Sequence, residues 1–210
     1  MNRNNIVFGV LSDWDVAIDM SELQTHTGFE VTRTVPFMAI DLLSEEALSG
    51  QVKHLYRHDL ESMFYILVWV LFCYKDGYRL HPLPSKFDEW TQSTMAHCVD
   101  SKTSLLRRGW KSTAATHSWG LVERRIAERW RMYFETAYAS RESANARWRE
   151  ARDIAQFLGG VEPSPPVEAD DVEGVWAEFC GVVKTSIVDT ISLLPGALAL
   201  PPRLAALVRE

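Results

Sequence analysis

An uninterrupted apolar run over residues 63–74, M-F-Y-I-L-V-W-V-L-F-C-Y, constrains the fold of this chain more than any other feature. No charged side chain interrupts it. His58-Asp59 before the run and Asp76-Gly77 after it are typical start and stop signals of a helix. The run is too short to span a bilayer, which needs about 20 apolar residues. The pattern therefore predicts a helix over residues 59–74 that is buried at the centre of a domain.

Three further segments carry a helical pattern. Residues 87–108 predict one or two helices, with Gly109 just after their end. Over residues 119–158 the apolar side chains recur at steps of three, four and seven, which fits one face of a helix. Residues 140–145 are the point at which this long helix would divide in two. Residues 172–183 predict another amphipathic helix.

Strand content is small. Residues 6–11 are β-branched and apolar and predict one short strand, whereas residues 13–44 have no helical period and predict a loop. We therefore expect a mainly α fold with a short strand element at its N-terminus, built around the buried central helix. The expected division is a body over residues 1–184 and an apolar, proline-broken C-terminal tail over residues 185–210.

The composition of the chain indicates which kinds of binding partner are not expected. The 210 residues suffice for one domain with a sizeable core, and the net charge of −6 offers no basic field for nucleic acid. No membrane partner and no signal peptide are expected. Cys73, Cys98 and Cys180 form no C-x-x-C pair, which is typical of reduced thiols in an intracellular protein, cytoplasmic or nuclear. The six histidines show no zinc-ligand spacing.

Residues 121–152 carry eight arginines and five glutamates. Mixed charges at spacings of three and four usually form a solvated helix face. A site for an acidic partner is the alternative interpretation of the same arginines.

The triplet Asp13-Trp14-Asp15 directly follows the predicted strand. Carboxylates at the point where a strand gives way to a loop suit a divalent cation held next to a phosphate. A solvated acidic turn would explain the triplet alone equally well. Two later segments bear on the choice: T-R-T-V-P-F-M-A-I-D-L-L over residues 32–43, and R-H-D-L-E-S-M-F over residues 57–64.

In this order the three segments resemble the C-terminal lobe of the fungal-type protein kinase family, over residues 9–106 best, with residues 119–158 as a helical extension or insert. The resemblance implies that Asp13 holds the magnesium of Mg-ATP, in a D-W-D triplet that replaces the usual D-F-G. Asn4-Asn5-Ile6 is similar to the end of the family's catalytic loop, which makes Asn5 a second candidate for cofactor binding. Asn5 precedes Asp13 by only eight positions, a short span for two paired strands and a turn.

Residues 32–43 are similar to the end of a kinase activation segment, where the family has G-T-x-P-F-M-A and then an acidic residue. The resemblance implies that Thr34 lines the peptide-substrate side of the site. It also implies that Asp41 takes the structural ion-pair position of the Glu in A-P-E. Arg33 stands where a glycine is usual. A loop leading into a hydrophobic anchor is the alternative, although it does not explain the order of the motifs.

Arg57-His58-Asp59-Leu60 looks like the kinase catalytic loop H-R-D-L-x-x-x-N but does not match it in two respects. The segment follows Asp13, whereas the catalytic loop precedes the metal-binding Asp, and the expected Asn position is Phe64. Asp59 and Ser62 instead match the start of the central helix of the lobe. Structural roles are therefore expected for both, with Asp59 as a carboxylate at the helix N-terminus.

The 210 residues contain no G-x-G-x-x-G run, and neither a V-A-I-K-like strand nor an H-x-D sequence precedes Asp13. The expected protein is a truncated kinase-like lobe without a catalytic residue of its own. The family activity is phosphoryl transfer from Mg-ATP to Ser or Thr of a protein, and we do not expect this chain alone to catalyse it or necessarily to bind a cofactor. The alternatives are a non-catalytic, pseudokinase-like module that binds a protein, and a small-molecule phosphotransferase. The last explains Asp13 but not residues 37–43.

Overall fold

The computed structural model describes residues 2–3, 6–7, 35–75, 78–92, 94–110, 120, 123–166 and 171–191. The chain separates into two compact units, Met1–Thr32 and Arg33–Glu210. In the first unit, β1 (Asn2–Arg3) and β2 (Ile6–Val7) form an antiparallel pair. The strand predicted over residues 6–11 is thus observed at its first two positions, and its remainder lies outside the described residues.

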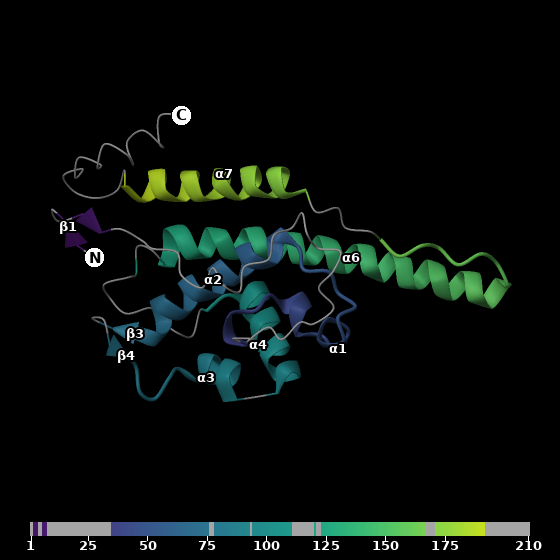
Figure 1. The fold of residues 1–210 in the computed structure, drawn as a ribbon, viewed down its shortest axis with the longest axis horizontal. Helices are drawn as coiled ribbons and strands as arrows, with labels where there is room; N and C mark the ends of the chain where they lie inside the picture. The colour runs from purple at the N-terminus through teal and green to yellow at the C-terminus, as the bar shows by residue number, and fades with distance from the viewer. Residues whose placement is uncertain are drawn as a thin grey trace. The chain divides into compact units, whose positions relative to one another are not determined.

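The described part of the second unit is mainly helical, so the mainly α prediction is confirmed (Figure 1). In chain order the elements are η3 (Val35–Phe37), η4 (Ile40–Leu43), α1 (Glu45–Leu48), α2 (Tyr56–Cys73), β3 (Tyr74–Lys75), β4 (Tyr78–Arg79), α3 (Ser85–Gln92), α4 (Met95–Arg108), the π-helical turn η6 (Glu123–Ala127), α6 (Glu128–Leu158) and α7 (Val172–Ile191).

Helix α2 begins at Tyr56 rather than at Asp59 because a histidine completes its first turn. Leu55 precedes the helix in an extended conformation, and its backbone N–H donates to Nδ1 of His58 over 3.0 Å. The imidazole thereby takes the part that Glu or Gln usually plays at the third helical position. At the other end, Tyr74 leaves the helix in an extended conformation and pairs with Arg79 across the β3–β4 hairpin.

Most of the surface of α2 is buried, as the charge-free run over residues 63–74 predicts. The helix contacts η3, η6, α6 and α7, and Phe64, Tyr65 and Val68 are fully inaccessible. One stripe differs: Met63, Ile66 and Val70 are 40–53% exposed. These three positions follow each other at steps of three and four, so they share one face of the helix, which is only partly covered.

The segment predicted to hold one or two helices forms two, α3 and α4, and α3 packs aromatic side chains against α2. The rings of Phe87 and Trp90 lie 5.0 Å apart, and Phe72 stacks on Phe87 at 5.5 Å. Helix α4 ends at Gly109 with φ of 66°, a conformation that glycine adopts without strain. The predicted end of this segment is therefore confirmed.

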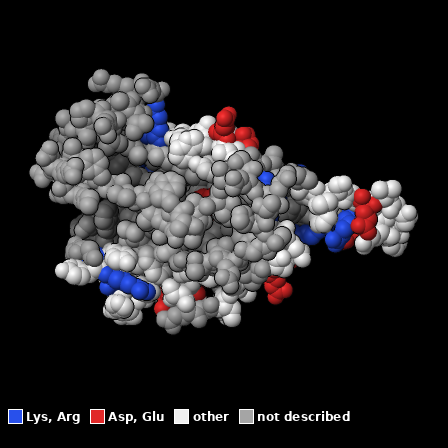
Figure 2. All heavy atoms as spheres, in the orientation of Figure 1, with Lys and Arg blue, Asp and Glu red and all other residues white. Residues whose placement is uncertain are grey.

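Helix α6 runs for 31 residues without the break expected at residues 140–145. Its first half packs against α7 through Phe134 and Phe179, whose rings are 5.9 Å apart. Its other end extends beyond the remaining helices of this unit (Figure 1), where acidic and basic side chains lie next to one another (Figure 2). Helix α7 continues to Ile191, past the predicted end at residue 183. Among the described helices none has the length and apolar character needed to cross a membrane.

Candidate functional site

The backbone of residues 35–43 lies against α2 and α4 and forms the centre of the candidate site. Phe37 of η3 packs edge-on against Trp69 of α2, with ring centroids 5.6 Å apart. Ala39 is fully buried, and Ile40 and Leu43 are nearly so. This stretch was expected to be a loop. It forms two short 3-10 turns instead, because its apolar side chains are anchored in the core.

Lys102 of α4 holds the first part of this segment. Its Nζ donates to the carbonyl oxygen of Val35 over 3.1 Å and to that of Met38 over 2.6 Å. The side chain is fully inaccessible, so water does not compete for these bonds. The carbonyl oxygen of Val35 also accepts the backbone N–H of Met38 over 3.3 Å, so the ammonium group is its second donor, and the same group satisfies the carbonyl oxygen of Met38.

Glu61 of α2 holds the next part of the segment. Its Oε1 accepts the backbone N–H of Ile40 over 3.0 Å and the hydroxyl of Tyr65 over 2.9 Å. Burial raises the pKa of Glu61, and the hydrogen bond from Ile40 opposes that rise by favouring the carboxylate. The pKa of Tyr65 is also raised, by its burial and by the adjacent Glu61.

Tyr65 lies between the two groups that hold the segment. The Nζ of Lys102 is 4.3 Å from the centroid of the Tyr65 ring and 5.3 Å from that of Trp90. Such distances allow cation–π attraction, which partly replaces the lost hydration of the ammonium group. Burial nevertheless lowers the pKa of Lys102 to about 8, although Cys98 and Glu61 favour its charged form.

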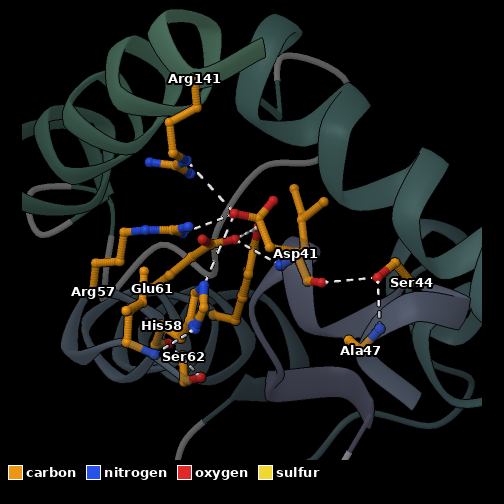
Figure 3. Close-up of polar contacts among 11 residues, drawn as sticks. Asp41, Ser44, Ala47, Arg57, His58, Glu61, Ser62 and Arg141 are labelled. Carbon is orange, nitrogen blue, oxygen red and sulfur yellow. Dashed lines mark hydrogen bonds and ion pairs between the residues drawn. The ribbon is translucent and has the colours of Figure 1, made fainter. Parts of the chain in front are cut away.

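Asp41 of η4 joins this segment to α2 and α6 (Figure 3). Its Oδ2 lies 2.8 Å from Nη1 of Arg57 and 3.5 Å from Nε of Arg141, and both arginine side chains are mostly buried. Nε2 of His58 is 3.9 Å away, beyond an ordinary hydrogen bond. Burial alone would raise the pKa of Asp41, but the imidazole of His58 and the charges of Arg141 and Arg57 together hold it well below its usual range.

His58 is oriented by the helix start. Because Nδ1 accepts the N–H of Leu55, the proton of the neutral ring is on Nε2, which faces Asp41. Ser62, one turn later, donates its hydroxyl to the backbone oxygen of His58 over 2.9 Å. Asp59 lies in the same first turn but points to solvent, where it pairs with Nε2 of His54 over 3.1 Å.

Three residues singled out in the sequence, Asn5, Asp13 and Thr34, lie outside the described residues. Of the predicted site residues outside α2, Asp41 is therefore the one that the described structure places against the start of the central helix. Among the described residues no group of three or more His, Cys, Asp or Glu side chains could hold a metal ion. Asp13 as a magnesium ligand stays a prediction from the motif.

Sequence reasoning did not find Lys102, Glu61 or Arg141. For Lys102 a signal was present: it falls between the apolar positions Cys98 and Leu105, on the face of α4 that packs into the core. A charged residue on such a face is expected to have buried partners. Nothing in the local sequence distinguishes Arg141 from the other arginines of α6.

In the comparison with known proteins, residues 2–71 match the family model described as fungal protein kinase, a span that begins at β1 and ends within α2. It includes the D-W-D triplet, the segment that Lys102 and Glu61 hold, and the start of the central helix. No curated protein and no solved structure matches the chain.

Proposed function

We propose, from the match of residues 2–71 to the fungal protein kinase model, that this chain forms the substrate-side, helical part of a kinase-like domain. Its function in that role is to present the backbone around residues 34–41 to a protein. The observation that carries the proposal is the pair of buried groups, Lys102 and Glu61, that hold this backbone from α4 and α2.

A fixed backbone is what phosphoryl transfer requires on the acceptor side. The reaction depends on positioning the target hydroxyl in line with the transferred phosphoryl group, and on electrostatic stabilisation. Thr34 immediately precedes η3, whose first carbonyl is bonded to Lys102. The buried bonds therefore fix the backbone that immediately follows Thr34.

The donor side is less complete in this sequence. In the family, Mg-ATP supplies the phosphoryl group, and Asp13 is the residue of this chain that would hold its magnesium. One or two carboxylates usually need phosphate oxygens and water to complete a magnesium site. No Gly-rich loop, paired lysine or catalytic Asp precedes Asp13. We therefore propose that transfer to protein Ser or Thr is not catalysed by the 210 residues alone.

A non-catalytic module that binds a protein is the second candidate, and the same held backbone favours it. The two functions differ in their need for Mg-ATP. Both require a protein that contacts residues 34–41, and neither requires nucleic acid or a membrane.

Calorimetry with Mg-ATP and a radiolabel transfer assay on the purified chain separate the candidates. We expect no label transfer to a generic protein substrate and at most weak Mg-ATP binding that depends on Asp13. Asp13→Ala is compared with Asp15→Ala, a matched loss of one carboxylate from the position that glycine normally takes. Micromolar Mg-ATP binding that only Asp13→Ala abolishes, together with label transfer, would show that the chain is a catalyst and that our proposal is wrong.

A further inference from the structure

A pocket of about 470 Å³ lies beside Asp41, between the start of α2 and the middle of α6. Helix α6 supplies one wall, on which Arg141, Asn145 and Arg149 follow each other at steps of four. Residues at this spacing form one row along a helix. The pocket is therefore built from a basic row on α6 that faces the carboxylate of η4.

The arginines of this row carry more N–H donors than the described acceptor atoms can occupy. Asp41 offers Arg141 a single contact, at 3.5 Å from Nε, and the same oxygen also receives Arg57 at 2.8 Å. A guanidinium group carries five N–H donors. Within the described residues, the two terminal nitrogens of Arg141 have no acceptor.

The charge of the pocket is also incompletely balanced. Of its two acidic lining residues, Asp41 is shared by two arginines, and Glu142 pairs with Arg107. Arg149 is exposed and has no carboxylate partner in the described part of the chain. A mobile anion could therefore bind Arg149 and the terminal nitrogens of Arg141 without displacing an existing ion pair.

The remaining lining residues indicate the kind of anion. Asn145 and Ser140 offer further donors, and Tyr138, Ala144 and Pro166 are largely apolar. Sites of this volume take ligands much larger than an inorganic ion. A bound anion is therefore expected to carry an organic part that contacts these apolar groups.

We propose that this pocket binds the phosphate group of a phosphorylated serine or threonine in a partner protein. A phosphate monoester has three acceptor oxygens and a charge near −2, which suits two arginines and an amide donor better than a carboxylate does. Nucleic acid fits less well, because Asp41 and Glu142 would repel neighbouring phosphates and the chain carries a net charge of −6. The site thus takes one phosphate, flanked by uncharged peptide.

A titration of the ¹⁵N-labelled full chain with the capped peptide Ala-Ala-phosphoserine-Ala-Ala tests this proposal at pH 7.5 and 150 mM salt. The side-chain amide signal of Asn145 should shift and saturate, and the unphosphorylated peptide should leave it unchanged. Arg149→Glu should weaken binding at least tenfold. Arg147→Glu, the same change at an exposed position of α6 outside the pocket, should weaken it less than twofold.

Three results would overturn the proposal. Equal weakening by the two charge reversals would mean unspecific attraction to the arginine-rich helix. Inorganic phosphate that binds as tightly as the peptide would mean an adventitious ion only. A single-stranded RNA that binds more tightly than the peptide would mean a nucleic-acid site. Amide spectra of each variant verify folding, and Arg149→Gln replaces Arg149→Glu if the reversal unfolds the chain.

Discussion

Replacing Lys102 by methionine tests whether a buried charge holds residues 35–38. Methionine is similar in length and is uncharged, so the change removes the two hydrogen bonds to Val35 and Met38 without leaving a large cavity. At neutral pH two effects of opposite sign compete. The carbonyl oxygen of Met38 loses its partner, which costs about 1–3 kcal/mol for a buried group, whereas that of Val35 keeps the N–H of Met38. At the same time the cost of burying the charge disappears.

The pH dependence separates the two effects. The pKa of Lys102 falls from 10.5 to about 8 on folding, so between these values the unfolded chain binds more protons than the folded one. Stability therefore rises with pH through this window. From this shift the charge on Lys102 costs about 3 kcal/mol at pH 7 and about 1 kcal/mol at pH 10. The methionine variant has no such dependence.

Urea unfolding monitored by tryptophan fluorescence at pH 7, 8, 9 and 10 measures this difference. The free energy of unfolding of the wild type, relative to Lys102→Met, should increase by about 2–3 kcal/mol from pH 7 to pH 10. Lys184→Met, at an exposed position of α7, is the matched control for the loss of one ammonium group and should change the free energy of unfolding only slightly. A constant difference between wild type and Lys102→Met would refute the argument, because it would mean that Lys102 titrates alike in the folded and unfolded chain.

Two further changes test Asp41 and the burial of α2. Asp41→Asn should destabilise the chain by about 2–4 kcal/mol at pH 7, because it leaves partly buried arginines without a carboxylate. Folding lowers the pKa of Asp41, so its contribution to stability is present above its ordinary pKa of 3.8 and is lost as the pH falls further. In urea unfolding, the difference in free energy of unfolding between wild type and Asp41→Asn should therefore be smaller at pH 3 than at pH 7. Val68→Asp should abolish soluble expression, whereas Ile66→Asp, on the exposed stripe of the same helix at 46% exposure, should give a folded protein by circular dichroism. Equal solubility of the two α2 variants would contradict the described orientation of that helix.

Sequence periodicity predicted most of the helices because their apolar spacing is local information. It placed α3 and α4 and the glycine that ends α4. It missed the continuity of α6 because residues 140–145 are polar and lack an apolar stripe. Those residues have adequate helix propensity, and Arg141 and Glu142 among them contact Asp41 and Arg107, so tertiary context decides the outcome.

The contacts of the candidate site were less predictable, because each joins residues that are far apart in the sequence. The motif indicated an ion pair at Asp41 but not that its partner would be Arg141 on a helix outside the matched region. Lys102 and Glu61 contact the backbone of residues 35–40 rather than side chains. Bonds to backbone atoms leave no complementary pattern of residue types in a single sequence, so only the fold brings them to light.

Asp41 connects the held segment to the proposed phosphate pocket. Ile40, whose N–H is bonded to Glu61, and Asp41, whose carboxylate faces Arg141, are consecutive residues of η4. A phosphate bound to the terminal nitrogens of Arg141 restricts the side chain whose Nε contacts Asp41. Occupancy of the pocket and the position of η4, which Glu61 also holds, are then linked. Linked binding equilibria are reciprocal. A protein bound along residues 34–41 must therefore change the affinity of the pocket for phosphate. The factor is the same as that by which phosphate changes the affinity for that protein.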